Sequence, residues 1–368
     1  MKTKFFPFAF IFLFLLAGCG PMKKSQEKSD LIKAYDLDFN WGEGGPNGFP
    51  NPGKWADVSP EAQIKWYKDL GVNTIQTFCV SCNGYAWYKN GVVPEQPGLN
   101  CDYLPEMVRL GHREGMRVFG YFCIGANTRW GMEHPDLSYG YPSDLHIPLT
   151  RQYMEYLDKA IRDAVGKTGI DGFMVDWFYQ PKRTSTGGKW LACEKERYQE
   201  LMNEPFPGEE KLSSEKYNAF SRLAIEKCWD VVHKAAKETN PNCLIWLTCN
   251  NITHPHYKDS KLFREVDWLM NEGGDLTRID SIRSMVGKDT RLITCLADWN
   301  KQDPKSVALN AIKSGVGLYG FAKPNDTGLL MPISQYLSFP VDSFKGDNRN
   351  IATFARVYND LPLDFVQK

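Results

Sequence analysis

The sequence predicts an α/β protein, a single-domain (β/α)8 TIM barrel. Short apolar runs alternate with amphipathic helical stretches from residue 31 to the end of the chain, which is the order of a parallel sheet covered by helices. Eight such strands are expected, and no long antiparallel stretch interrupts them. The two longest connections, 124–147 and 178–213, both follow strands, on the barrel face where active sites lie.

The amino terminus has the pattern of an export signal. Lys2 and Lys4 precede an apolar run, Phe5 to Leu16, of about twelve residues, too short to span a bilayer as a helix. The run ends in Leu16-Ala17-Gly18-Cys19, which resembles the lipobox of bacterial lipoproteins. We therefore expect residues 1–18 to be a lipoprotein signal peptide and Cys19 to carry the lipid.

The segment that follows is polar and is expected to be a lipidated tether, residues 19–30. Residues 31–368 would then form the barrel domain itself. Removing residues 1–18 from the 368 leaves 350, ordinary for one barrel with insertions. The expected location is the cell envelope of a bacterium, with the protein held by its lipid alone at the periplasmic or outer-membrane surface.

The expected elements follow in order along the chain. Ser59 before Pro60 is a typical helix start. The expected strands are Leu31–Phe39, Asn73–Cys79, Arg117–Cys123, Gly169–Asp176, Cys243–Thr248, Val266–Met270, Arg291–Cys295 and Val316–Tyr319. The expected helices are Pro60–Leu70, Tyr103–Glu114, Pro148–Val165, Ser214–Glu238 and Asn348–Asn359.

Two other architectures fit the sequence less well. An open doubly wound sheet needs fewer strands and a glycine-rich phosphate turn that opens a helix; Gly42-Glu43-Gly44-Gly45 follows the first strand, but no helix begins there. A solenoid would show a repeated motif, and none is visible.

Composition argues against a nucleic-acid partner. Lys plus Arg and Asp plus Glu are 44 each, so the chain lacks the basic field that binds a polyphosphate. Aromatic residues make up 13% of the chain, with 11 Trp, and many fall in expected loops, where flat rings suit the apolar faces of sugars.

The cysteines and histidines do not form a metal-binding pattern. The chain has 10 cysteines; with Cys19 lipidated, nine remain in an oxidising compartment and at least one stays free. Cys79 and Cys82 form a single C-x-x-C followed by an Asn-Gly turn, which we interpret as structural. His254-Pro255-His256 is a weak metal pair, so neither a metal nor a cofactor is expected.

Strand alternation selects two carboxylates. In GIDGFMVDW, Met174 and Asp176 share the face opposite Phe173 and Val175, so Asp176 points into the barrel mouth. In VDWLMNE the same alternation groups Glu272 with the inward residues just before two glycines. Glycosidases need such a pair, one group to protonate the departing oxygen and one to attack the anomeric carbon or activate water. A separation of about 5 to 6 Å would imply retention.

Other polar residues at strand ends are candidates to bind hydroxyls or to replace one of the pair. Asp298 ends the run LITCLAD and is an alternative second carboxylate. Asp36 and Asp38 share one side of the first strand; Asp36 lies deeper and is interpreted as structural. The expected substrate-binding residues are Asp38, Asn40, Trp41, Asn83, Tyr85, Trp177, Asn250, Asp298 and Trp299.

Several of these segments together resemble a known family. The segments are Asn40-Trp41-Gly42, the helix 59–70, Thr77 to Tyr85 (TFCVSCNGY) and Phe119-Gly120-Tyr121-Phe122. They resemble the amino-terminal half of alpha-L-fucosidase-type glycoside hydrolases, and also an uncharacterised group of hypothetical glycosyl hydrolases with related barrels. The resemblance covers residues 31 to 180. It implies a TIM barrel and a nucleophile at Asp176, since the family's fourth strand ends in Phe-Asp and this one ends in Val175-Asp176.

The sequence departs from the family pattern where the family binds sugar through histidines. Those histidines fall on Asn40, Ser81 and Cys82 here, and shorter side chains do not offer imidazole hydrogen bonds at the same reach. Fucose is therefore in doubt as the substrate. The family's acid/base residue has no fixed sequence context, so Glu272 rests on the alternation argument.

Three hypotheses follow. The first is a retaining, exo-acting glycoside hydrolase that degrades a glycan, with Asp176 as nucleophile, Glu272 as acid and base, and no cofactor. The second is a non-catalytic surface glycan-binding lipoprotein built on a degenerate glycosidase barrel, motivated by the missing histidines. The third, a redox or metal protein based on Cys79 and Cys82, ranks last.

Overall fold

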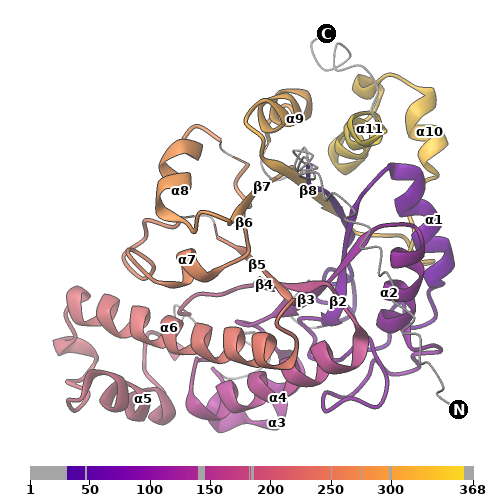
Figure 1. The fold of residues 1–368 in the computed structure, drawn as a ribbon. Helices are drawn as coiled ribbons and strands as arrows, with labels where there is room; N and C mark the ends of the chain where they lie inside the picture. Colours follow the sequence, from indigo (N-terminus) through magenta and orange to yellow (C-terminus); the bar gives the residue numbers. More distant parts are fainter. Residues whose placement is uncertain are drawn as a thin grey trace, which may run out of the picture. The chain divides into compact units, whose positions relative to one another are not determined.

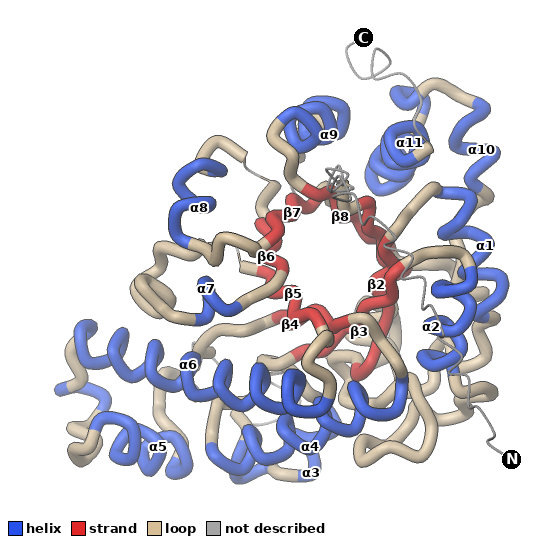
Figure 2. The backbone as a smooth tube through the Cα atoms, in the orientation of Figure 1, coloured by secondary structure: helices blue, strands red, loops and turns tan. Residues whose placement is uncertain are grey.

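Eight parallel strands pair in chain order and close on themselves in the described part of the chain. The computed structural model describes residues 31–45, 48–139, 146–181, 183, 186–249, 251–274, 276–297 and 301–359. The strands form a ring with the helices outside it (Figures 1 and 2), which confirms the predicted (β/α)8 barrel. They are β1 (Lys33–Leu37), β2 (Thr74–Val80), β3 (Arg117–Cys123), β4 (Gly172–Asp176), β5 (Leu244–Thr248), β6 (Trp268–Asn271), β7 (Arg291–Cys295) and β8 (Gly317–Ala322).

The barrel is closed by β1 and β8. Their register runs from Lys33 opposite Leu318 to Leu37 opposite Ala322. The first and the last strand of the chain therefore each have a partner on both sides. Closure removes the unpaired edge that an open sheet exposes.

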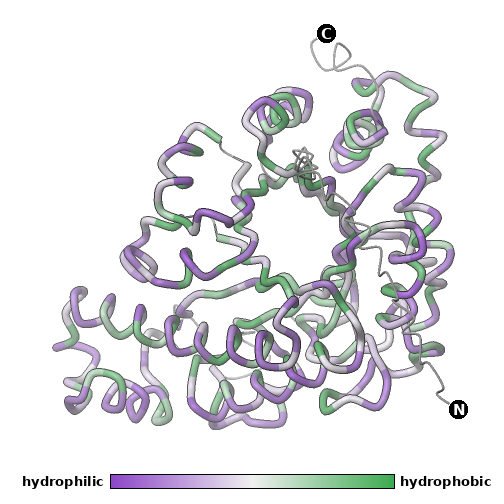
Figure 3. Tube along the Cα trace, viewed as in Figure 1, coloured by the Kyte–Doolittle hydropathy of each residue, from purple (hydrophilic) through white to green (hydrophobic). Residues whose placement is uncertain are grey.

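The helices surround this ring. Their turns alternate between hydrophilic and hydrophobic colours, as expected for helices with one face on the sheet and one in water (Figure 3). They are α1 (Pro60–Leu70), α2 (Tyr103–Arg113), α3 (Thr128–Glu133), α4 (Arg151–Thr168), α5 (Ala192–Met202), α6 (Ser214–Thr239), α7 (Leu262–Glu265), α8 (Ile279–Met285), α9 (Pro304–Lys313), α10 (Ile333–Ser338) and α11 (Gly346–Tyr358), with 3-10 turns η2 (Pro135–Leu137), η4 (Glu209–Lys211) and η6 (Val341–Ser343).

Local signals set the ends of α1 as the sequence predicts. The Ser59 hydroxyl accepts a hydrogen bond from the Ala62 N–H at 3.2 Å, and Pro60 occupies the first turn, where no N–H is needed. Gly71 ends the helix in a left-handed conformation (φ 84°), and its N–H returns to the Lys68 carbonyl.

Aromatic rings fill the barrel interior below the mouth. The rings of Phe119 and Trp268 stack at 4.4 Å, and the ring of Trp246 lies 5.6 Å from that of Trp268. Gly172 on β4 leaves room for them, because a Cβ there would lie 2.6 Å from the Phe119 ring and 2.3 Å from the Leu244 carbonyl oxygen. The interior is thus a packed core, and ligand access is confined to the mouth.

The last helix, α11, is held where β1 pairs with β8. The Tyr358 hydroxyl lies 3.0 Å from the Ala34 carbonyl oxygen on β1 and 2.9 Å from that of Leu318 on β8. The Lys33 ammonium in turn donates to the Tyr358 carbonyl at 2.8 Å. These contacts fix α11 across the β1–β8 closure.

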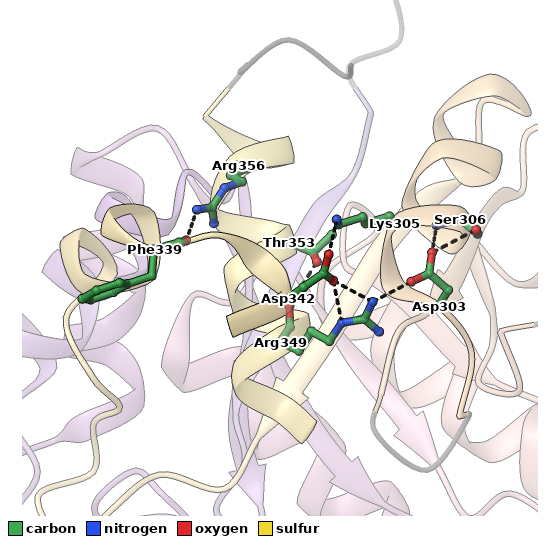
Figure 4. A network of polar contacts seen from close by, with 8 residues as sticks. All are labelled: Asp303, Lys305, Ser306, Phe339, Asp342, Arg349, Thr353 and Arg356. Carbon is green, nitrogen blue, oxygen red and sulfur yellow. Dashed lines mark hydrogen bonds and ion pairs between the residues drawn. The ribbon is translucent and has the colours of Figure 1, made fainter. Parts of the chain in front are cut away.

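A polar network links α11 to its neighbours at the surface (Figure 4). The Arg349 guanidinium donates to Asp303, the N-cap of α9, at 2.9 Å and to Asp342 in η6 at 3.0 Å; Lys305 also pairs with Asp342. Since these carboxylates are largely solvated, each pair contributes less than about 1 kcal/mol to stability.

The long connection after β4 carries a buried ion pair. The Arg183 guanidinium donates to Glu194 on α5, and both side chains are almost inaccessible to solvent. The Tyr139 hydroxyl also donates to Glu194 at 2.6 Å, and Arg183 lies 3.8 Å over the Trp190 ring. The buried charge of Glu194 is therefore balanced by Arg183 and by hydrogen-bond donors. The helix α5 and the segment around Trp190 pack against α6 (Figure 1).

The residues described form one compact unit that begins at Leu31. No helix within these described ranges is long and apolar enough to cross a bilayer.

Candidate active site

Asp176 ends β4 and points into the barrel mouth, as strand alternation predicts. Register pairs Tyr121 with Met174 and Cys123 with Asp176, and neighbours paired in this way share one side of the sheet. The Tyr121 hydroxyl donates to Asp176 Oδ2 at 2.8 Å, and the Trp177 N–H donates to Oδ1 at 2.8 Å. Burial raises the pKa of the Asp176 carboxyl to about 6, and these two donors limit the rise.

The backbone turns sharply just after this carboxylate. Trp177 has φ 54°, a left-handed conformation that costs a non-glycine residue about 1–3 kcal/mol. Gly125 packs against the turn so closely that a Cβ there would lie 2.3 Å from the Trp177 carbonyl oxygen. The Ile124 N–H also donates to the Asp176 carbonyl at 3.0 Å. The turn after β4 is thus held by the end of β3.

Glu272 follows β6 and is partly buried. The Thr248 hydroxyl at the end of β5 lies 3.5 Å from Glu272 Oε2, a long contact. Asp176 and Glu272 both line the same two cavities, one deep and one wide. The structure therefore brings together the two carboxylates that the sequence predicts.

The two cavities differ in size and lining. The deep cavity, about 60 Å³, lies between the ends of the inner strands and reaches down to Asp36 and Gln76. The wide cavity, about 510 Å³, extends over the loops after β4 and β5. Its aromatic and imidazole walls are Trp177, Phe178, Tyr179, Tyr217, His254, His256 and Tyr257.

Two further aspartates lie on the floor of the deep cavity. Asp36 is 2% exposed and Asp38 6%. The Asn40 N–H donates to Asp38 Oδ1 at 2.7 Å, whereas Asp36 Oδ1 accepts no hydrogen bond from the described residues. Burial raises the pKa of Asp38 to about 7 and that of Asp36 well above its usual range.

The predicted substrate-binding residues divide into three groups. Asp38, Asn40, Trp41 and Trp177 line the deep cavity. Asn83 and Tyr85 line neither cavity: the Asn83 amide is buried and pairs with Gln96, and the Tyr85 ring lies under Arg129. The structure thus does not bring these two together with the other predicted residues. Asn250, Asp298, Trp299 and the lipidation residue Cys19 lie outside the described residues.

Sequence reasoning did not find several residues of the site. Tyr121 was placed on β3 without a role, although alternation puts it on the inner side with Phe119. Gln76 and Tyr319 form part of the deep floor, where the Tyr319 hydroxyl donates to Gln76 Oε1. The wide cavity depends on loops whose course the strand pattern does not determine.

The three positions that correspond to family histidines make internal contacts. Asn40 Oδ1 accepts from the Cys82 N–H at 2.9 Å, and the Ser81 hydroxyl accepts from the Trp87 indole at 2.6 Å. Ser81 and Cys82 are almost completely buried. At two of the three positions the side chain is therefore part of the scaffold of the β2 loop.

The described cysteines are free thiols, and most are buried. Burial raises the pKa of both Cys79 and Cys82, the opposite of what a reactive thiol needs. Among the residues with described positions, no group of three or more His, Cys, Asp or Glu side chains is placed to hold a metal ion.

The fold and the residues at the carboxyl ends of its strands define a class of protein, the TIM barrels with paired carboxylates at that face. Residues 59–177, about a third of the chain, match the family model described as hypothetical glycosyl hydrolase 6. The segment includes α1 to β4 and ends just after Asp176. The resemblance predicted from the sequence is confirmed over this segment.

Solved structures share the fold. Alpha-L-fucosidase isoenzyme 2 from Paenibacillus thiaminolyticus superposes with a TM-score of 0.63 at 13% identity, over 90% of this chain and 49% of that one. Beta-galactosidase from Marinomonas ef1 gives 0.54 at 11%, over 91% and 61%. Alpha-L-fucosidase AlfC from Lactobacillus casei gives 0.50 at 10%, over 89% and 95%. The chain spans about half the length of the first of these, and no curated protein matches it by sequence.

Proposed function

We propose that the protein is a retaining, exo-acting glycoside hydrolase in which Asp176 is the nucleophile and Glu272 the acid/base. The observation that carries this proposal is that both carboxylates line both cavities. A glycosidic bond at the junction of the cavities would meet the two groups at once. The match to a glycosyl hydrolase family model and the fold shared with glycosidases support the same reaction class.

The protonation state of Asp176 suits attack on an anomeric carbon. A carboxyl with a pKa of about 6 is roughly nine-tenths ionised at pH 7, so the nucleophile is charged at neutral pH. The Tyr121 hydroxyl and the Trp177 N–H occupy one oxygen each and fix the plane of the carboxylate. Rigid placement of a nucleophile is a large part of the catalytic effect.

Glu272 would protonate the departing oxygen and then take a proton from the attacking water. Its strand, β6, is separated from β4 only by β5. Two strand spacings amount to about 9–10 Å between backbones, and inward side chains shorten the distance between the carboxyl groups. A short separation of about 5 Å between the carboxyl groups, which accompanies retention, is within reach of this arrangement.

The cavity sizes support exo action. The deep cavity of about 60 Å³ holds only a few water-sized groups, so it would take a substituent of the terminal sugar. The ring and the leaving group would lie in the wide cavity, where Trp177 and Tyr179 stack at 6.3 Å. We propose Asp38, Asn40 and Trp41, together with Asn250, Asp298 and Trp299, as further sugar contacts.

The proposal is tested with a panel of aryl glycosides that includes alpha-L-fucosides and beta-galactosides. Asp176→Ala should abolish hydrolysis of the active substrate with an unchanged melting temperature. A matched control is Asp289→Ala, because Asp289 is 90% exposed in the loop before β7, at the opposite end of the barrel. Unchanged turnover in Asp176→Ala would eliminate Asp176 as the nucleophile.

A second function, glycan binding without catalysis, is favoured by one observation. The resemblance places the family histidines at Asn40, Ser81 and Cys82, and the last two of these side chains are buried in the scaffold of the β2 loop. A binder would show saturable affinity for a glycan without release of reducing sugar. Asp176→Asn would then change affinity alone.

We also propose that the protein is anchored in the cell envelope through a lipid on Cys19. The leader that precedes this cysteine in the sequence supports the proposal. In a bacterial host, labelled palmitate should enter the wild-type protein but not the Cys19→Ala variant. Equal labelling of both would refute the anchor.

A further inference from the structure

The deep cavity is unusually rich in hydrogen-bond acceptors. Four carboxylates line it, and no Lys, Arg or His side chain is among its described lining residues. The carboxylates are Asp36, Asp38, Asp176 and Glu272. A cation that enters this space would meet four carboxyl groups and no cationic side chain among the described lining residues.

The hydroxyl groups of the lining already donate their protons within the protein. The Tyr121 hydroxyl donates to Asp176, that of Tyr319 to Gln76 Oε1, and that of Thr248 to Glu272. The donors that remain among the described lining residues are the Asn40 amide and the indole N–H groups of Trp41 and Trp177. The cavity therefore complements a group that carries several donors.

Asp36 supplies a second, independent indication. The residue is 2% exposed and lines the cavity, and its Oδ1 accepts no hydrogen bond from any described residue. A buried carboxylate oxygen without a donor is costly, and a ligand donor would remove that cost.

We propose that the deep cavity binds a primary ammonium group on the sugar, so that the substrate class is glycans with an unacetylated amino sugar at the terminus. An ammonium has three N–H donors and no acceptor, which matches the lining better than a hydroxyl, with one donor and two acceptor sites. The volume of about 60 Å³ admits such a substituent and not a sugar ring. An N-acetyl group would lose the charge and add an acceptor.

The electrostatics of the empty protein agree with this assignment. Burial raises the pKa of Asp36 and Asp38, and neighbouring carboxylates raise it further. A bound ammonium would favour the ionised form of both groups and pair with it. A uronate would find no cationic partner among the described lining residues.

This inference rests on the proposed function only in taking the ligand to be a sugar, so the test measures binding rather than turnover. Isothermal titration calorimetry would compare the 2-amino and 6-amino derivatives of glucose and galactose with their neutral parents. Hydrogen bonds to a charged group exceed neutral ones enough to give at least one amino sugar about tenfold tighter binding than its parent. If no amino sugar binds more tightly than its parent, the inference is overturned.

Variants locate the effect. Asp36→Asn and Asp38→Asn keep the side-chain shape, and neither amide can ionise to pair with a bound ammonium. Either substitution should therefore abolish most of the preference for the amine. Asp289→Asn removes the same charge from an exposed site and should leave the preference unchanged. A preference that persists in both cavity variants would place the amine elsewhere and refute the assignment.

The inference and the proposed function can fail separately. If neutral aryl glycosides are hydrolysed with a higher kcat/KM than their amino counterparts, the ammonium site is wrong and the hydrolase stands. If amino sugars bind with the predicted dependence on Asp36 and no aryl glycoside is cut, the ammonium site stands and the hydrolase is wrong.

Discussion

Removal of a single hydroxyl at Tyr121 should shift the pH dependence of the enzyme. The Tyr121 hydroxyl donates to Asp176 Oδ2 at 2.8 Å, a hydrogen bond that stabilises the charged carboxylate and lowers its pKa. In Tyr121→Phe this donor is lost while the ring and its packing are kept. The pKa of Asp176 should therefore rise above its starting value of about 6.

The size of the shift follows from the strength of the hydrogen bond. A hydrogen bond to a charged group is worth roughly 1.5–3 kcal/mol, and one pKa unit corresponds to about 1.4 kcal/mol. The pKa should rise by about one to two units, to about 7–8. Because the nucleophile must be ionised, the active fraction at pH 7 would fall from about nine-tenths to about one-half or less.

The assay is the pH profile of kcat/KM with the active aryl glycoside from the panel. We expect the acidic limb of Tyr121→Phe to move to higher pH, with the rate recovering where Asp176 is ionised. Tyr103→Phe is the control, because this buried hydroxyl contacts Gln63 and Thr77 rather than a carboxylate of the site. An acidic limb that stays in place, or moves to lower pH, would refute the reasoning.

Three further predictions concern the scaffold of the site. Gly125→Ala should push the Trp177 backbone and lower kcat/KM by about 10- to 100-fold, measured with the same glycoside; unchanged kinetics would show that the turn tolerates the displacement. Asp38→Asn should be more stable than wild type at pH 8 in urea unfolding. The folded-state pKa of Asp38, about 7, lies above the unfolded value, so the wild type loses stability as pH rises from about 4 to 7; the advantage of the variant should vanish below about pH 4. Glu194→Gln should lower the free energy of unfolding by about 3–5 kcal/mol, because it leaves Arg183 buried without its counter-charge, and a loss under 1 kcal/mol would contradict this.

The strand pattern was sufficient to predict the architecture. The predicted bounds Arg117–Cys123 and Arg291–Cys295 agree with the observed strands, because each run begins at an arginine and is rich in β-branched or aromatic residues. The fourth strand begins at Gly172 rather than Gly169, because Gly169 caps α4 in a left-handed conformation (φ 73°). Cap geometry, which depends on one residue, is harder to predict than the strand itself.

The connections were predicted less well. The segment 178–213 was expected only as a long connection, yet it contains α5, whose first turn is stabilised by Glu194. Glu194 accepts from the Leu191 N–H at the start of the helix, and its carboxylate is held in turn by Arg183 and Tyr139, which no local pattern connects to α5. Tertiary contacts therefore decide the structure of this segment.

Some features of the candidate site were likewise predictable from the sequence, and others were not. Alternation along a strand predicts that Asp176 and Glu272 face inward, since it depends on the backbone alone. It does not give the depth of a residue on a neighbouring strand, so the contact between Tyr121 and Asp176 was not predicted. It also does not give the contact between Asn83 and Gln96, because Gln96 lies in a loop.

The central claim, that Asp176 forms a bond to the anomeric carbon, is tested most directly by proton NMR of the first product released from an active aryl glycoside. Wild type should release the sugar with the anomeric configuration of the substrate, and Asp176→Ala should release none. An inverted first product, or the same product at an undiminished rate from the variant, would contradict the account.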